Sequence, residues 1–97
     1  MPSYAILGNY TEQGIKTMKD LPARLQASKD AIQGVGGRMI YFYLTFGEYD
    51  FISVVEVPDA DAAATVLLGI AADGNVRTST MLAFTEDETA TIVGALP

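Results

Sequence analysis

The residue types present in this chain limit its chemistry before any fold is considered. The 97 residues include no histidine and no cysteine. This excludes the usual nucleophile–base pairs, imidazole metal ligands and a histidine haem ligand. Carboxylates and tyrosines remain, and several lie in or near the stretch FGEYD at residues 46–50. The composition favours binding over catalysis, because few general acid–base groups are left that titrate near neutral pH.

A ligand-binding set is predicted around this stretch, and no catalytic residue is assigned. The set is Tyr41, Tyr43, Gly47, Tyr49, Asp50 and Glu56. Each member also has a structural interpretation. Asp50 suits bonding to the backbone N–H groups of a turn, and Tyr49 suits packing across a hairpin. Tyr41, Tyr43 and Glu56 suit a subunit interface as well as a ligand contact.

Metal and cofactor sites find little support in the sequence. The acidic run at 86–88 lacks the spacing of a calcium loop, and acidic residues there complement a helix N-terminus. We therefore predict no metal and no cofactor. Arg38 and Arg77 are expected at strand edges in an acidic chain. They suit surface or intersubunit ion pairs, with carboxylate recognition as the alternative.

Size and charge limit the partners. Twelve acidic against six basic residues give a formal charge of −6, which disfavours nucleic acid and anionic membranes. No stretch resembles a leader or a membrane helix, so we expect a cytoplasmic protein. The chain is predicted to be one domain, residues 1–97. A domain of this size buries roughly 60–68% of its unfolded surface, so oligomerisation would add useful burial.

The positioning elements follow from the apolar pattern. Strands are predicted at 4–10, 38–46, 50–57 and 76–84, with helices at 12–18, 21–35 and 60–72 and a short amphipathic helix near the C-terminus. Predicted helix caps are Thr11, Asp20, Asp59 and the Thr85–Glu88 capping box. The order βαββαβ plus a C-terminal helix predicts the α+β class, with a ferredoxin-like, four-stranded antiparallel sheet.

The stretch at 46–50 also sets the register of the predicted hairpin. Gly47 and Glu48 fit a two-residue type II′ turn, which separates the side chains into two faces. One face, predicted to lie beneath the helices, carries Ile40, Phe42, Leu44, Phe46, Phe51, Ser53, Val55 and Val57. The other carries Met39, Tyr41, Tyr43, Thr45, Asp50, Ile52, Val54 and Glu56. This second face is too apolar to be left to water, so we expect a second subunit, a ligand or both to cover it.

Several segments together resemble a known family. They are YAILGNYTEQGI, the GGR before the hairpin, YFYLTFGEYDFISVVEVPDADAA and GNVRTSTMLAFTEDE. Nearly the whole chain is similar to the GYD-domain family, which implies the dimeric α/β-barrel form of the ferredoxin-like fold. The Gly-Glu-Tyr-Asp hairpin at 47–50, followed by VEVPD and by the VRT strand at 76–78, is more faintly similar to the ligand-binding regulatory domain of the Lrp/AsnC family. That similarity implies binding of small, amino-acid-like effectors between subunits, without the helix-turn-helix that DNA binding requires.

Three hypotheses for function follow. The favoured one is a small-molecule-binding module that is a homodimer or a larger homo-oligomer. The alternative is a cofactor-independent monooxygenase-like or isomerase-like enzyme, with Asp50 or Glu56 transferring protons and Tyr41 and Tyr43 orienting the substrate. The third is a purely structural assembly module.

Overall fold

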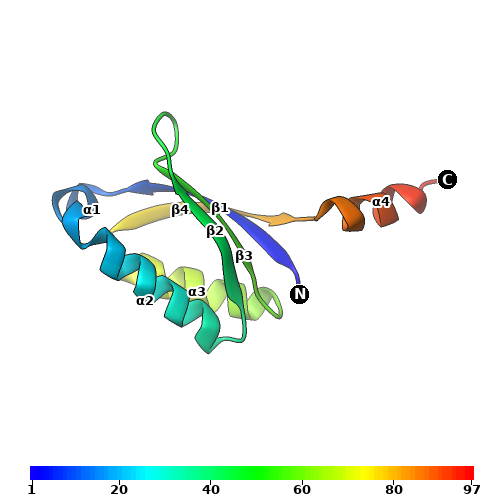
Figure 1. The fold of residues 1–97 in the computed structure, drawn as a ribbon, viewed down its shortest axis with the longest axis horizontal. Coiled ribbons are helices and arrows are strands. Elements are labelled where there is room, and N and C mark those ends of the chain that lie inside the picture. The colour runs from blue at the N-terminus through cyan, green and yellow to red at the C-terminus, as the bar shows by residue number, and fades with distance from the viewer.

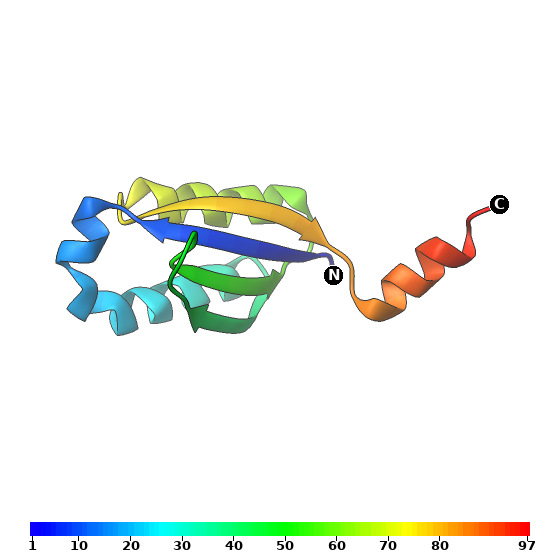
Figure 2. The same cartoon turned by 90° about the horizontal axis from the view of Figure 1, so that it is seen from above.

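The computed structural model describes all 97 residues, which form a four-stranded antiparallel sheet with two long helices on one side (Figures 1 and 2). The strands are β1 (Ser3–Tyr10), β2 (Arg38–Leu44), β3 (Phe51–Glu56) and β4 (Val76–Ala83). The helices are α1 (Glu12–Lys16), α2 (Leu21–Gly34), α3 (Ala60–Ala72) and α4 (Glu86–Gly94). The strand order β2-β3-β1-β4 confirms the ferredoxin-like prediction, and the sheet of one chain is open rather than closed into a barrel.

Three of the four predicted helix caps form. Thr11 accepts from the Gly14 N–H at 3.1 Å, and Asp59 accepts from the Ala62 N–H at 2.8 Å. The capping box at the start of α4 makes both of its hydrogen bonds. The prediction for Asp20 was wrong: a 3₁₀ turn (Met18–Asp20) leads directly into α2, so Asp20 has helical backbone angles and makes no side-chain cap.

The hairpin has the predicted register but not the predicted turn. Leu44 pairs with Phe51, as a two-residue turn at Gly47 and Glu48 requires, yet strand pairing stops there and residues 45–50 form a longer loop. The register shifts between Met39 and Tyr41, which is a β-bulge at Ile40.

The bulge and the longer loop correct the predicted faces. Met39 packs against the core beneath the helices, whereas Ile40 is exposed. Leu44 and Phe46 are exposed as well, Phe46 to 99%, because the helices do not extend over the loop. The predicted positions of Phe42, Phe51, Ser53, Val55 and Val57 beneath the helices are correct, since Phe42 packs on the core and the other four are buried.

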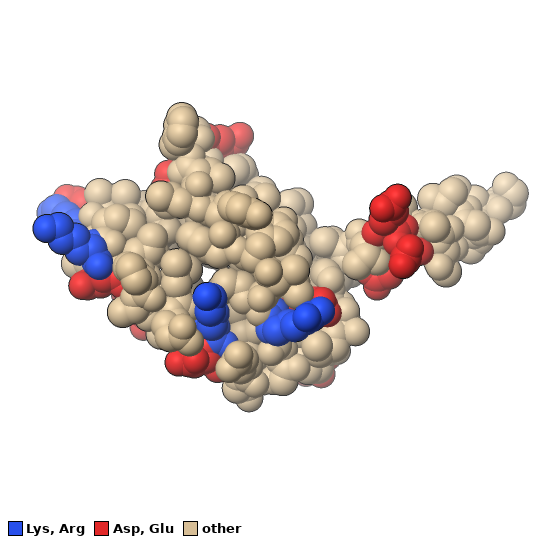
Figure 3. All heavy atoms as spheres, in the orientation of Figure 1, with Lys and Arg blue, Asp and Glu red and all other residues tan.

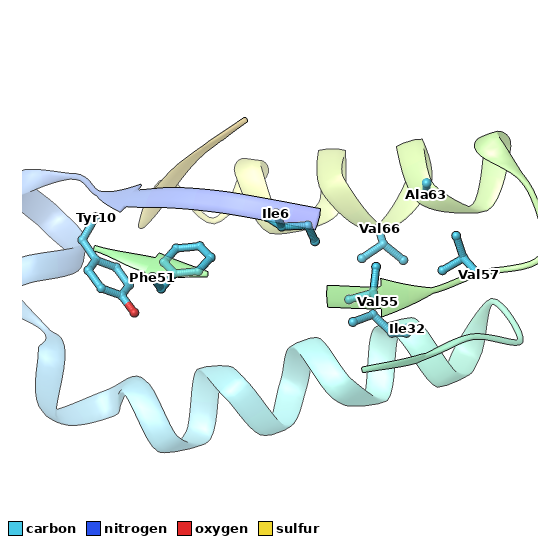
Figure 4. Close-up of a cluster of buried hydrophobic side chains, with 8 residues drawn as sticks. All are labelled: Ile6, Tyr10, Ile32, Phe51, Val55, Val57, Ala63 and Val66. Atoms are coloured by element: carbon cyan, nitrogen blue, oxygen red, sulfur yellow. The ribbon is translucent and has the colours of Figure 1, made fainter. Parts of the chain in front are cut away.

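The core lies between the sheet and the pair α2 and α3. Its buried apolar residues are Ile6, Tyr10, Ile32, Phe51, Val55, Val57, Ala63 and Val66. Figure 4 shows them in two groups: Tyr10 and Phe51 lie together at one end, and the group around Ile32 and Val57 lies at the other. Ile32 and Val57 are almost fully buried, at 1% and 0% exposure.

The C-terminal helix stands apart from this core. α4 extends away from the sheet, and the C-terminus lies far from the rest of the molecule (Figures 1 and 2). All its residues are exposed, including the apolar side chains of Ile92 and Val93. None of the helices has the length and apolar character needed to cross a membrane.

Candidate functional site

The sheet face opposite α2 and α3, which we call the open face, holds part of the predicted set. Tyr41 and Tyr43 lie next to each other on β2, with ring centroids 5.1 Å apart. Strand register places Ile52 and Val54 of β3 beside them, on the side away from the helices. The open face continues over β1 and β4 through Ala5, Leu7, Asn9, Arg77, Ser79 and Met81. No helix of the chain covers it (Figure 1).

Glu56 lies on the open face at the last residue of β3, an interior strand of the sheet. Its Oε1 atom accepts from Arg38 Nη2 at 2.9 Å, across the β2–β3 pair. The Arg38 side chain is largely exposed, so this ion pair is screened by solvent and adds little stability. Glu56 therefore has a local partner, while Arg77 lies exposed on β4 opposite Asn9.

The remaining predicted residues lie in or beside the hairpin loop. Asp50 Oδ2 accepts from the backbone N–H of Tyr10 at 2.9 Å, and the Asp50 N–H donates to Gly8 O at 2.8 Å. The carboxylate thus serves as a backbone acceptor that ties the loop to β1. The Tyr49 carbonyl accepts from Thr45 Oγ1 at 2.7 Å. Gly47 lies near the tip with φ of +124°, in a region that favours glycine.

The predicted set does not form one site within a single chain. Asp50 and Glu56 lie at opposite ends of β3, about 20 Å apart at roughly 3.3 Å per residue. Tyr41 and Tyr43 lie on the open face, whereas Asp50 lines a shallow hollow between the hairpin loop and α1, together with Leu44, Phe46 and Ile15. Tyr41 and Tyr43 form one neighbouring pair, and Gly47, Tyr49 and Asp50 form a separate group in or beside the hairpin loop. No group of histidine, cysteine, aspartate or glutamate is arranged to hold a metal ion.

A larger hollow, which sequence reasoning missed, lies between the sheet and the helices. Its volume is about 350 Å³, within the range typical of small-molecule sites. Side chains of α2, α3 and all four strands line it, and most are apolar. In the space-filling view a small gap in the surface lies between α2 and β2 (Figure 3). The facing lining residues Ala27, Ser28 and Ala31 of α2 and Gly69 of α3 are small, and this is the signal that sequence reasoning passed over.

One end of this hollow is polar. Tyr10 and Arg24 line it together, and the Arg24 guanidinium carbon lies 6.0 Å from the centroid of the Tyr10 ring. Figure 4 shows the Tyr10 hydroxyl on the side that faces α2. Burial raises the pKa of Tyr10 above its ordinary value of 10.0, an effect that Arg24 opposes and Asp50 reinforces. Tyr10 therefore stays neutral in the folded protein well into the alkaline range.

The strand order places the chain among small ferredoxin-like domains, and the chain leaves both the open face and the large hollow uncovered. The family model of the GYD domain matches residues 4–93, and the chain belongs to the GYD-domain family. A relative from Thermus thermophilus, named glutamine synthetase and cystathionine beta-lyase binding protein, is 33% identical over 82 residues. The match covers 84% of this chain and 86% of the relative.

Solved structures support the fainter resemblance. A feast or famine regulatory protein from M. tuberculosis, complexed with L-methionine, is similar with a TM-score of 0.65 and 22% identity. The match covers 88% of this chain and 51% of the regulator, so the chain spans about half of that protein. A solved structure of a protein from Thermus thermophilus has a TM-score of 0.55 and 26% identity, over 88% of this chain and 95% of that one. At such identity the regulator shows the fold alone, and both predicted resemblances are confirmed.

Proposed function

We propose that this chain is a homo-oligomeric module that binds a small molecule, with the open faces of two copies packed against each other. The open face is the observation that carries the proposal. It presents Tyr41, Tyr43, Ile52 and Val54 on the side that no helix covers. An apolar sheet face of this kind is stable in water only when a second layer covers it. A second copy supplies that layer by twofold symmetry.

The detached helix α4 supports the same assembly. Its nine residues are fewer than the roughly 12–15 that an isolated helix needs to be stable in water. It nevertheless exposes Ile92 and Val93, and Leu96 is exposed just after its end. Its first turn is acidic, and Figure 3 shows a cluster of acidic side chains partway along the extension. Contact with another copy would bury these side chains and stabilise the helix.

In this assembly the predicted binding residues take different positions. Tyr41, Tyr43 and Glu56 lie within the interface between the sheets, because they are on the open face. Gly47, Tyr49 and Asp50 lie in or beside the hairpin loop, at the rim of the interface. The small molecule has two candidate locations: this interface and the hollow beneath α2 and α3.

A charge placed on the open face tests the assembly. Ile52→Glu would put two like charges close together across the twofold interface and desolvate both, so we expect it to dissociate the oligomer. Leu68→Glu is the matched control, because Leu68 is exposed on α3, away from the open face. Light scattering at micromolar concentration should show an oligomer for the unmodified chain and for Leu68→Glu, and a monomer for Ile52→Glu. A monomeric unmodified protein would refute the proposal.

Ligand binding is tested by thermal shift against a broad metabolite panel. A ligand at about 100 times its dissociation constant adds about 2.7 kcal/mol of stability. For a domain of this size each kcal/mol raises Tm by roughly 4–8 °C, so a specific ligand is easily detected. A panel that includes amino acids and carboxylic acids, and that produces no shift at all, would remove the support for a binding function.

A second candidate function is binding of enzymes. It is favoured by the Thermus thermophilus relative, which is named for binding glutamine synthetase and cystathionine beta-lyase and aligns over most of both chains. The exposed side chains of α4 offer a surface for such a partner. Mixing the purified chain with each enzyme, followed by size-exclusion chromatography, tests this function. Failure to co-elute with either enzyme would reject it.

The catalytic alternative has weaker support. It assigns proton transfer to Asp50 or Glu56, but each carboxylate already has a partner within the chain. The orienting tyrosines lie on the open face, whereas the Asp50 side chain is bonded to the backbone of β1. Any turnover that survives Asp50→Asn and Glu56→Gln would reject these assignments. The cytoplasmic location stays a prediction.

A further inference from the structure

The polar end of the large hollow contains hydrogen-bonding groups without partners. Arg24 Nη2 donates to the carbonyl oxygens of Gly14 at 3.2 Å and Thr17 at 3.3 Å, which fixes the guanidinium against the segment after β1. Its Nε and Nη1 atoms are buried and have no acceptor. The Tyr10 hydroxyl is also buried without a partner. Leaving such groups unsatisfied destabilises the folded protein, and more so when the group is charged.

The missing partner is an acceptor, and one that carries negative charge suits a guanidinium best. The unpaired atoms of Arg24 can only donate, and a neutral tyrosine hydroxyl readily donates as well. A carboxylate would accept from both side chains through charge-assisted hydrogen bonds and would neutralise the buried guanidinium. A doubly charged phosphate fits less well, because its second charge would be desolvated beside a single cation in an acidic chain.

The rest of the hollow is mainly apolar and suits an apolar part of a ligand. Away from Arg24 and Tyr10 the lining includes Leu25, Phe42, Val66 and Ile70. Asp73 also lines the hollow but is exposed to water, so its charge is screened. The exposed lining residues Ala27, Ala31 and Gly69 leave an opening between α2 and α3. The hollow therefore offers a cationic end, an apolar body and a route to solvent.

We propose that this hollow binds a small monocarboxylate with an apolar tail, with its carboxylate on Arg24 and Tyr10 and its tail between α2, α3 and the sheet. The inference rests on the proposed binding function and names its ligand class. An apolar helix from a second copy, such as α4, would fill the same space. Its apolar side chains would leave the Arg24 donors unpaired, and this disfavours it as the occupant.

The first test compares three probes that share one tail. Sodium octanoate, 1-octanol and octylamine are added to the full chain, below the concentration at which octanoate forms micelles, and binding is measured by calorimetry and thermal shift. We expect octanoate to bind at least tenfold more tightly than octanol and octylamine not to bind. Equal affinity for octanoate and octanol, or a preference for octylamine, would overturn the proposal.

Variants then locate the site. Arg24→Met keeps an apolar stem of similar length and should weaken octanoate binding at least tenfold while leaving octanol unchanged. Tyr10→Phe should weaken octanoate binding by a smaller factor. It tests the position of the carboxylate independently if Arg24→Met fails to fold. Octanoate binding that neither substitution weakens would overturn the assignment of the carboxylate.

Gly69→Leu tests the space itself. Gly69 lines the hollow, and a Cβ atom there meets nothing within 4 Å, so the position has room for a leucine side chain. Octanoate binding should be lost in Gly69→Leu and kept in Gly34→Leu, where a Cβ is equally free but does not line the hollow. If Gly69→Leu instead lowers the number of subunits, a helix of another copy fills the hollow and the proposal is wrong.

The failure of this inference differs from the failure of the proposed function. If another compound of the metabolite panel binds and octanoate does not, the ligand class is wrong and the binding function stands. If neither octanoate nor any panel compound binds, both are rejected.

Discussion

The two ends of the space between helices and sheet are built differently. At the closed end Ile32, Val55, Val57, Ala63 and Val66 pack against one another, and Ile32 and Val57 lose nearly all contact with water. At the hollow end Tyr10 and Phe51 form an aromatic pair, with ring centroids 5.5 Å apart, beside a space of about 350 Å³. The same pair of helices bounds both ends.

Side-chain size on the helices accounts for this difference. Ile32 and Val66 fill the closed end with branched side chains, which also form one boundary of the hollow. The rest of the hollow's helical lining includes the small residues Ala27, Ser28 and Gly69. Aromatic side chains hold the floor of the hollow in place. The Phe51 ring lies over Gly8, where an added Cβ would come within 2.0 Å of Cζ, and stacks on Phe42 at 5.5 Å. Closely packed aromatic side chains therefore line the hollow on the sheet side, and small side chains line it on the helix side.

The largest effect should come from truncating the closed end. Ile32→Ala removes a fully buried side chain from a packed group and should cost about 3 kcal/mol of unfolding free energy. Leu25→Ala removes a side chain that is only half-buried, so it should cost only about 1 kcal/mol. Denaturant unfolding at a fixed protein concentration measures both. Equal losses would show that the two ends are packed alike.

Filling the hollow end should have a smaller, opposite effect. Gly69→Leu replaces a poor helix former with a good one, worth up to about 1 kcal/mol, and adds apolar contacts within the hollow. Gly34→Leu has no hollow to fill and lies at the end of α2, so it should gain less. The difference between their unfolding free energies measures the benefit of filling the space. A destabilised Gly69→Leu would mean that the site is already filled or cannot accept a side chain.

The smallest effect concerns the ionisation of Tyr10. Because the pKa of Tyr10 is raised in the folded protein, its contribution to stability is fully present below pH 10 and is lost as the pH rises through the folded value. Ultraviolet titration should show that Tyr10→Phe has one late-ionising tyrosine fewer than the unmodified chain. The variant should also lose less stability above pH 10. If the tyrosine lost in the variant is not a late-ionising one, Tyr10 is in contact with water.

Much of the fold could be predicted from the sequence because its signals are local. Thr11, Asp59 and Thr85 cap helices through bonds to residues three positions away, and apolar periodicity marks the strands. The predicted cap at Asp20 was wrong because a cap pattern does not reveal the 3₁₀ turn that precedes α2. The predicted position of Ile40 beneath the helices was wrong for a similar reason. The β-bulge there depends on both strands and on the helices above them, so the sequence of β2 alone does not reveal it.

The candidate site was less predictable because it depends on distant contacts. Tyr41 and Tyr43 could be placed on one face by simple alternation, and the structure brings them together. The partner of Asp50 is a backbone N–H forty positions away, which no local pattern reveals. Arg24 carries no motif either. Its role emerges only once α2 has placed it beside Tyr10 and left part of its guanidinium without an acceptor.

The most direct test of the account is native mass spectrometry of the freshly purified chain, before and after addition of octanoate. The account predicts an oligomer with an even number of subunits, built on the open face, that gains up to one octanoate per subunit. A monomer that takes up no octanoate would contradict both the assembly and the ligand site.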